Sequence, residues 1–155
     1  MTPTLRGRHG HRFTFRVQYG ARAVHLPSHR QLRRWAAAAL ARDAKVTLRI
    51  VGEVEGRRLN REFRGKDYPT NVLAFAYSEQ APLAGDIVLC APVIRQEARA
   101  QGLSLAAHYA HLVVHGMLHL QGYDHRRSGA AQVMESLESE IVTQLGYPDP
   151  YAVQA

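Results

Sequence analysis

Hydrophobic and polar residues alternate along two short stretches of the chain, two further short stretches are mostly apolar, and apolar residues recur every three or four positions along five longer ones. Alternation is typical of strands with one buried face, short apolar runs are typical of buried strands, and the longer spacing is typical of amphipathic helices. The pattern therefore predicts strands over residues 13–19, 46–51, 72–77 and 86–90, and helices over residues 28–40, 54–63, 92–102, 104–120 and 129–145.

The order of these elements predicts one α/β (α+β) domain that spans residues 1–155. We expect a small, mixed, mostly parallel four-stranded sheet packed with about five helices. The first two strands are separated by a helix and should be parallel, while the last two are close enough in sequence for an antiparallel hairpin. Residues 1–12 are rich in Gly, Arg and His, and we expect them to be flexible.

Length and composition favour a globular protein. The chain has 155 residues, of which 46% are hydrophobic, and no apolar run is long enough to cross a membrane. Trp35 lies on the apolar face of its helix and is expected in the core. The one cysteine, Cys90, ends an apolar strand, so we expect a buried small side chain rather than a reactive thiol. Without a leader-like segment or a possible internal disulfide, the cytoplasm is the expected location. The sequence has no heptad repeat, so it does not predict an oligomeric state.

The net charge of +7 is distributed unevenly. Residues 1–42 carry nine Arg and no acid (+9), residues 43–127 carry eleven basic and nine acidic residues (+2), and residues 128–155 carry four acids (−4). Most of the basic residues are Arg, whose planar guanidinium can bind two phosphate oxygens at once. This charge balance favours a polyanionic partner, such as RNA, DNA or an anionic membrane surface.

The chemistry concentrates in the histidines, five of which lie between positions 108 and 125. His115 and His119 stand one helical turn apart and can direct two imidazoles at one metal ion. Gly122 then ends the helix, and His125 can supply a third nitrogen. Three His ligands with an open fourth position are typical of a catalytic metal site. We expect one Zn²⁺ per chain, and imidazole also suits other divalent metals.

The polar neighbours of these three histidines have other expected roles. His108 and His111 share the same helix face, and structural or positioning roles are favoured for them over direct ligation. Asp124 can accept a hydrogen bond from the second nitrogen of His125, or it can serve as a turn carboxylate.

The spacing from His115 to His125 also matches that of zinc proteases of the metzincin kind. Those enzymes place Glu, their general base, directly after the first His. Gly116 occupies that position here, which argues against peptide hydrolysis.

Three blocks of the sequence resemble the YbeY family of metal-dependent endoribonucleases. Residues 111–125 read HLVVHGMLHLQGYDH, residues 59–75 read LNREFRGKDYPTNVLAF, and residues 85–88 read GDIV. The blocks follow the order of the family, and the resemblance runs from about residue 46 to residue 145. Asn71 and Ala74 stand where the family often has Asp and Ser.

The resemblance implies that His115, His119 and His125 are zinc ligands and that Arg64 and His115 take part in catalysis. It implies a single-strand-specific endoribonuclease that acts in 16S rRNA 3′-end processing and ribosome maturation. Its partners would be single-stranded rRNA and the ribosome or its small subunit. A metal ion and a guanidinium both stabilise the negative charge that develops in phosphodiester cleavage. Either a water on the metal or the 2′-OH of the RNA can be the nucleophile.

Two other functions compete with this one. The basic segment over residues 1–42 suits a ribosome- or RNA-binding assembly factor with a structural metal. The histidine spacing alone suits a zinc metalloprotease, against which Gly116 argues.

Overall fold

The computed structural model describes residues 4–6, 10–78, 80, 82–124 and 128–152. The elements in chain order are β1 (Thr4–Arg6), β2 (Arg12–Tyr19), α1 (His29–Ala38), β3 (Ala44–Val51), α2 (Glu53–Arg64), β4 (Val72–Ser78), β5 (Leu83–Cys90), α3 (Ala91–Gln101), α4 (Leu105–Leu120) and α5 (Ser128–Gln144). All the predicted helices and strands are present, although β5 begins three residues before the predicted start at position 86.

The sheet has the strand order β1-β2-β3-β5-β4. The inner strands β2, β3 and β5 are parallel, and the outer strands β1 and β4 pair antiparallel with their neighbours. The predicted fold class, an α+β domain with a mixed sheet and five helices, is confirmed. β1 extends the sheet by one strand, inside the segment expected to be flexible. A strand of three residues is too short to produce a visible alternation, and it depends on β2 for its hydrogen bonds.

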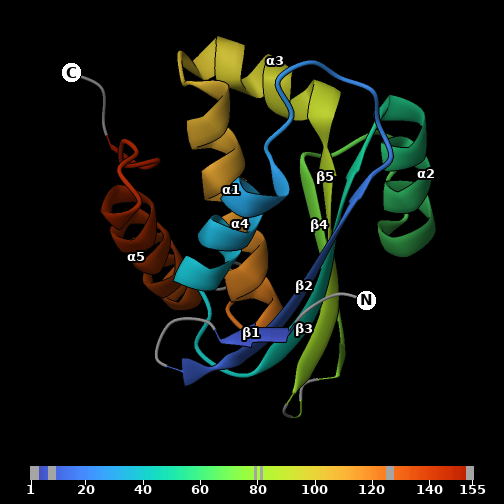
Figure 1. Cartoon of the computed structure of the whole chain (residues 1–155). Helices are drawn as coiled ribbons and strands as arrows, with labels where there is room; N and C mark the ends of the chain where they lie inside the picture. The colour runs from blue at the N-terminus through green and yellow to red at the C-terminus, as the bar shows by residue number, and fades with distance from the viewer. Residues whose placement is uncertain (1–3, 7–9, 79, 81, 125–127, 153–155) are drawn as a thin grey trace.

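Helices cover the two faces of this sheet unequally (Figure 1). α1 and α4 lie on one face, α5 packs against α4 on the outside, and α3 crosses one end of the sheet. α2 alone lies on the opposite face, near the end of β5. In the described part of the chain, no helix is long and apolar enough to span a membrane.

The main core fills the space between the sheet and the α1–α4 layer. Phe13 and Phe15 from β2 meet Trp35 of α1 and the apolar residues of α4 there. Trp35 is buried as predicted, and so is Cys90, whose pKa is raised by that burial. Ser28 caps α1, because its Oγ accepts a hydrogen bond from the Gln31 N–H at 3.1 Å.

Candidate active site

Helix α4 is buried over most of its surface, except along one side where a row of histidines is partly exposed. Between Ala107 and Leu120, every residue is buried except His111, His115 and His119, which are partly exposed. Their spacing of four keeps them on one side of the helix. Because all the other sides of α4 pack into the core, the helix cannot rotate, and the core fixes the positions of the imidazoles.

The turn that follows α4 also has the predicted form. Gly122 has a φ of +99°, a left-handed conformation that favours glycine, and its N–H donates to the His119 carbonyl at 3.1 Å. The chain therefore reverses direction directly after His119. His125, the predicted third ligand, lies outside the described residues, and with it the predicted contact of Asp124.

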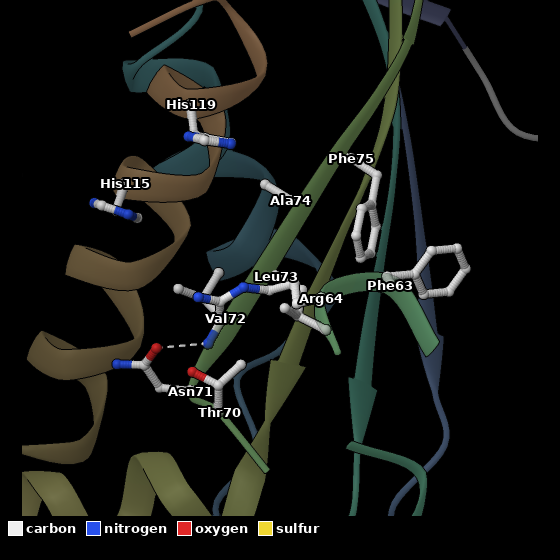
Figure 2. A pocket seen from close by; sticks show the side chains of 10 residues that line it. All are labelled: Phe63, Arg64, Thr70, Asn71, Val72, Leu73, Ala74, Phe75, His115 and His119. Carbon is white, nitrogen blue, oxygen red and sulfur yellow. Dashed lines mark hydrogen bonds between the residues drawn. The ribbon is translucent and has the colours of Figure 1, made fainter. Parts of the chain in front are cut away.

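A cavity of about 500 Å³ lies beside β4, an edge strand of the sheet (Figure 2). The imidazoles of His115 and His119 line it from α4, and Phe63 and Arg64 line it from the end of α2. The consecutive residues 70–75 complete the lining. The fold thus brings two of the predicted metal ligands and the predicted catalytic arginine to one cavity, although they are far apart in the sequence.

Arg64 lies in the last turn of α2 with its charge available to the cavity. Its Nη1 donates to Asn60 Oδ1 at 3.4 Å, and among the described residues no carboxylate pairs with it. Asn60 is buried and held by its own hydrogen bond to the Tyr68 carbonyl at 2.7 Å. By contrast, Arg57 makes two hydrogen bonds to Asp67, at 2.9 and 3.0 Å. Arg64 can therefore bind an anion without displacing a carboxylate.

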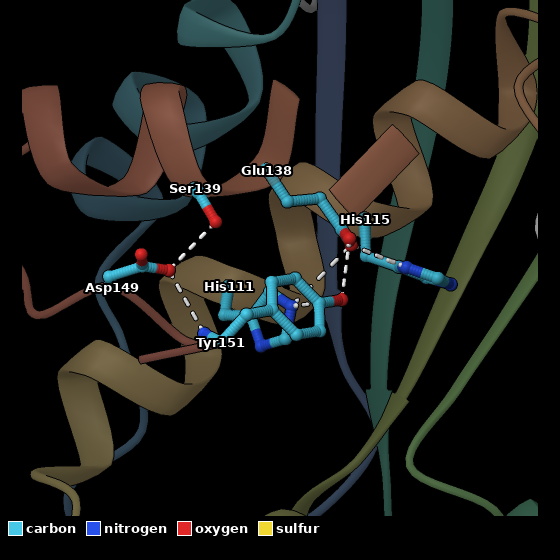
Figure 3. Close-up of polar contacts among 6 residues, drawn as sticks. All are labelled: His111, His115, Glu138, Ser139, Asp149 and Tyr151. Atoms are coloured by element: carbon cyan, nitrogen blue, oxygen red, sulfur yellow. Dashed lines mark hydrogen bonds and ion pairs between the residues drawn. The ribbon is translucent and has the colours of Figure 1, made fainter. Parts of the chain in front are cut away.

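A buried carboxylate lies behind His115 (Figure 3). Glu138 of α5 is 1% exposed, and its Oε1 lies 2.6 Å from His115 Nδ1. The Tyr151 hydroxyl donates to Oε2 at 2.6 Å, and His111 Nε2 lies 3.4 Å from Oε1. The contact between Nδ1 and Glu138 orients the imidazole of His115 so that its other nitrogen, Nε2, points away from Glu138. A carboxylate in this position fixes both the orientation and the tautomer of an imidazole.

These contacts keep Glu138 ionised. Burial alone would raise the pKa of Glu138, but the hydrogen bonds from His111, His115 and Tyr151 outweigh it and bring the pKa to about 2. Burial and the bond to Glu138 raise the pKa of Tyr151. At neutral pH, Glu138 is therefore an anion and Tyr151 is a hydrogen-bond donor to it.

The residues after α5 hold Tyr151 in place. Ser139 Oγ donates to Asp149 Oδ1 at 2.7 Å, and the same oxygen accepts the Tyr151 N–H at 2.9 Å. The segment after α5 is thereby fixed against the helix that carries Glu138.

The donor chemistry of the cavity fits a divalent metal ion. His115 and His119 offer imidazoles from adjacent turns of α4, and a carboxylate behind His115 is typical of metal-ligating histidines. No group of three His, Cys, Asp or Glu side chains able to hold a metal ion occurs within the residues that the structure describes. The two imidazoles therefore need a further ligand, and His125 remains the predicted one.

Comparison with known proteins identifies the family. The family model described as Endoribonuclease YbeY matches residues 23–146. The chain belongs to the YbeY family. Its relatives include endoribonuclease YbeY of Nitrosomonas europaea, 58% identical over 146 residues, which cover 94% of this chain and 89% of the relative. Endoribonuclease YbeY of Aromatoleum aromaticum is 60% identical over 126 residues, which cover 81% of this chain and 82% of the relative.

A solved structure shares the fold. The solution structure of a protein from Thermotoga maritima superposes with a TM-score of 0.54 and 24% sequence identity, covering 90% of this chain and 100% of that one. At this identity the likeness concerns the arrangement of helices and strands alone.

Two further histidines of α4, outside the cavity, contact carboxylates. His108 Nε2 lies 2.9 Å from Glu97 Oε1, and His111 contacts Glu138, which supports structural or positioning roles for both histidines. Asn71 also donates to Glu97, through Nδ2 at 3.1 and 3.3 Å. An Asp at position 71 would set two carboxylates against each other here, so Asn71 is matched to Glu97.

Gly116 is buried where α4 packs against β5. A Cβ at this position would lie 3.2 Å from two carbons of Ile87, closer than most side-chain contacts. A glutamate there would require the Ile87 side chain to give way by a few tenths of an ångström. The packing of this YbeY chain therefore disfavours the general base that metzincin-type proteases place after the first histidine.

The sequence patterns did not predict roles for Glu138, Tyr151 or Asn60 at this site. A signal for Glu138 exists, because it stands between Met134 and Val142 at helical spacing, and both of these are fully buried. A carboxylate on an apolar face indicates a buried partner, but the pattern does not say which one. Tyr151 and Asn60 act through contacts that local sequence does not encode.

Proposed function

We propose that this chain is a metal-dependent, single-strand-specific endoribonuclease of the cytoplasm. We propose that it acts in 16S rRNA 3′-end processing as the small ribosomal subunit matures. The cavity beside β4 carries the proposal, because His115 and His119 line it together with Arg64. Membership in the YbeY family supports the same activity.

In this proposal His115, His119 and His125 hold one divalent ion, with Zn²⁺ as the first choice. When bound, such an ion polarises phosphate oxygens and lowers the pKa of a water ligand. Glu138 keeps His115 in one orientation and one tautomer, because its Oε1 contacts Nδ1 and leaves Nε2 on the opposite side of the ring. Glu138 is therefore a positioning residue and does not touch the RNA.

Arg64 binds the phosphate that is cleaved. Negative charge grows on the phosphate oxygens as the bond to the leaving oxygen breaks, and a guanidinium within hydrogen-bonding distance stabilises that charge. Asn60 restrains the guanidinium through the 3.4 Å bond to Nη1. Because Arg64 has no carboxylate partner among the described residues, the phosphate does not have to displace one.

The size of the cavity supports single-stranded RNA as the substrate. A nucleotide that reaches His115, His119 and Arg64 has to enter a space of about 500 Å³, which suits one strand better than a duplex. β4 is an edge strand and has no further β-strand on its outer side within the described residues. The N–H and C=O groups on that side can therefore contact an extended RNA strand. The nine arginines of residues 1–42 support a longer polyanionic partner, such as the rRNA of the small subunit.

The test compares wild type with His119→Ala on an end-labelled single-stranded RNA, with and without a chelator. Cleavage by wild type alone, abolished by the chelator, is the expected result. Equal cleavage by both proteins would reveal a contaminating nuclease, which the variant controls for. If neither protein cleaves, the nuclease proposal is wrong, and a ribosome-binding assembly factor becomes the better description.

A further inference from the structure

Phe63 is an aromatic residue that the fold leaves exposed beside the active site. It lies in the last turn of α2 and is 60% exposed, whereas Leu59, one turn earlier, packs against a small buried cluster. Its ring centroid lies 4.7 Å from that of Phe75 of β4, with the ring planes at 45°. One part of the Phe63 ring is therefore supported by Phe75, and most of the side chain faces solvent.

The two rings stand between two hollows. Both Phe63 and Phe75 line the cavity that holds the imidazoles, and both also line a second hollow of about 190 Å³. Polar and charged groups line this second hollow, from Gln18, Thr47, Tyr77, Asp86 and the ion pair of Arg49 and Glu55. A planar group on Phe63 would thus have polar groups near its edge and the catalytic cavity beside it.

The next residue along the chain is Arg64, which lines the first cavity and has no carboxylate partner among the described residues. Figure 2 shows the guanidinium between the histidines and the Phe63–Phe75 pair. Single-stranded RNA repeats a phosphate and then a flat base, and proteins bind it with cations along the backbone and aromatic rings under the bases. The order of imidazoles, guanidinium and exposed aromatic ring matches that repeat.

We propose that Phe63 is a stacking platform for one nucleobase of the RNA, next to the phosphate that Arg64 binds. The base lies on the exposed part of the Phe63 ring, with its edge toward the second hollow. Stacking accepts any base, because every base has a π face, so this subsite adds affinity with little sequence preference. The inference rests on the proposed function, since it assumes that RNA is the substrate.

The test measures equilibrium binding of a fluorescein-labelled single-stranded RNA octamer to the full chain, in a chelator to prevent cleavage. Phe63→Ala should weaken binding about 5- to 150-fold, the usual range for loss of one stacked base. Phe63→Trp should bind as tightly as wild type, and Phe63→Leu should resemble Phe63→Ala because it keeps apolar volume without a π face. Tyr68→Ala is the control, because Tyr68 is exposed but lines neither hollow.

An RNA that lacks one base sharpens the test. When the missing base is the one that stacks, wild type and Phe63→Ala should bind the RNA equally well. The proposal is overturned if Phe63→Ala binds the complete RNA like wild type, if Phe63→Leu binds as well as Phe63→Trp, or if no single missing base removes the difference. The second of these outcomes would indicate an apolar contact, such as one with a protein side chain.

The outcomes separate this inference from the proposed function. If wild type cleaves RNA and Phe63→Ala binds and cleaves it equally well, the enzyme is a nuclease without this subsite. If wild type neither binds nor cleaves RNA, both proposals are wrong. Thermal unfolding checks that each variant folds, and the comparison of Phe63→Trp with Phe63→Leu decides the matter if Phe63→Ala is unstable.

Discussion

The two walls of the cavity are built in opposite ways. On the α4 side, the imidazoles stand on a helix buried in the core, and a carboxylate that is 1% exposed holds His115. On the α2 side, Phe63 is 60% exposed, and Arg64 is restrained by a single long hydrogen bond to Asn60. The helix that carries them stands alone on its face of the sheet (Figure 1).

This difference matches what each wall would have to bind. Metal–ligand distances tolerate changes of only about 0.2 Å, so metal ligands need the rigidity of a packed core. An RNA strand differs in base and conformation from one position to the next, and exposed side chains can adapt to it. If this interpretation is correct, metal binding and RNA binding can be lost separately.

The largest effect is expected for His119→Ala, on the rigid wall. It should reduce cleavage by at least about 10³-fold, equivalent to roughly 4 kcal/mol, because metal catalysis contributes several kcal/mol to such reactions. The metal content of the purified protein should fall as well. His29→Ala on α1 is the control, since His29 does not line the cavity. Full activity in His119→Ala would remove His119 from the site.

Arg64→Ala tests the opposite wall. Loss of one charge-stabilising donor should reduce cleavage about 10²- to 10³-fold. Metal affinity should be unchanged, because Arg64 belongs to a different element from the imidazoles. Arg58→Ala on the same helix is the matched control. If the metal affinity of Arg64→Ala falls as steeply as its activity, the two walls are not independent.

Glu138→Gln removes the charge behind His115 and keeps the size of the side chain. Loss of such a partner typically costs about 10- to 100-fold in metal affinity. Competition with a coloured chelator measures this affinity, and ¹⁵N chemical shifts of His115 in the metal-free protein report its tautomer. Glu135→Gln, on the exposed side of the same helix, should change neither quantity.

Tyr151→Phe removes one hydrogen bond to Glu138 and leaves the ring in place. A net loss of about 1 kcal/mol corresponds to roughly fivefold weaker metal binding. Tyr147→Phe is the control, because Tyr147 packs against Trp35 and not against Glu138. Combined with Glu138→Gln, the Tyr151→Phe change should have almost no further effect. Additive effects would show that Tyr151 does not act through Glu138.

The smallest effect concerns the attachment of α2. A hydrogen bond from Arg49 lowers the pKa of Glu55, and the two side chains tie α2 to β3. A carboxylate with a lowered pKa stabilises the fold above its unfolded-state pKa, near 4.5, and this contribution is lost as the pH falls through the folded-state value. The contribution is below about 1 kcal/mol, because the pair is partly exposed. The protection factors for hydrogen exchange, which compare each measured rate with the intrinsic rate at the same pH, should therefore fall in α2 before α4 on acidification, and Glu55→Gln should remove that difference.

The sequence predicted most of the fold, because periodicity is a local property. Nine of the ten elements follow from the spacing of apolar residues, and only β1 does not. Three residues cannot establish a period, and β1 exists because β2 offers a free edge.

The site was predictable only in part. His115 and His119 were predicted as ligands because helical spacing puts them on one face, and the role proposed for Arg64 came from a family resemblance; all three line one cavity. The partners behind the site escaped prediction because Glu138 and Tyr151 reach His115 across separate elements. Phe63 belonged to a helical pattern, but its exposure depends on how far α2 covers the sheet, which no local pattern encodes.

The tight contact between Gly116 and Ile87 bears on what this sequence could become. In the sequence, glutamate in place of Gly116 is all that separates residues 115–125 from the metzincin motif. In the folded chain that change has a cost, because a Cβ at this position would lie 3.2 Å from Ile87. The Ile87 side chain would have to move by a few tenths of an ångström before a glutamate could fit. The path from this histidine motif to a protease therefore depends on the packing of β5 as well as on residue 116.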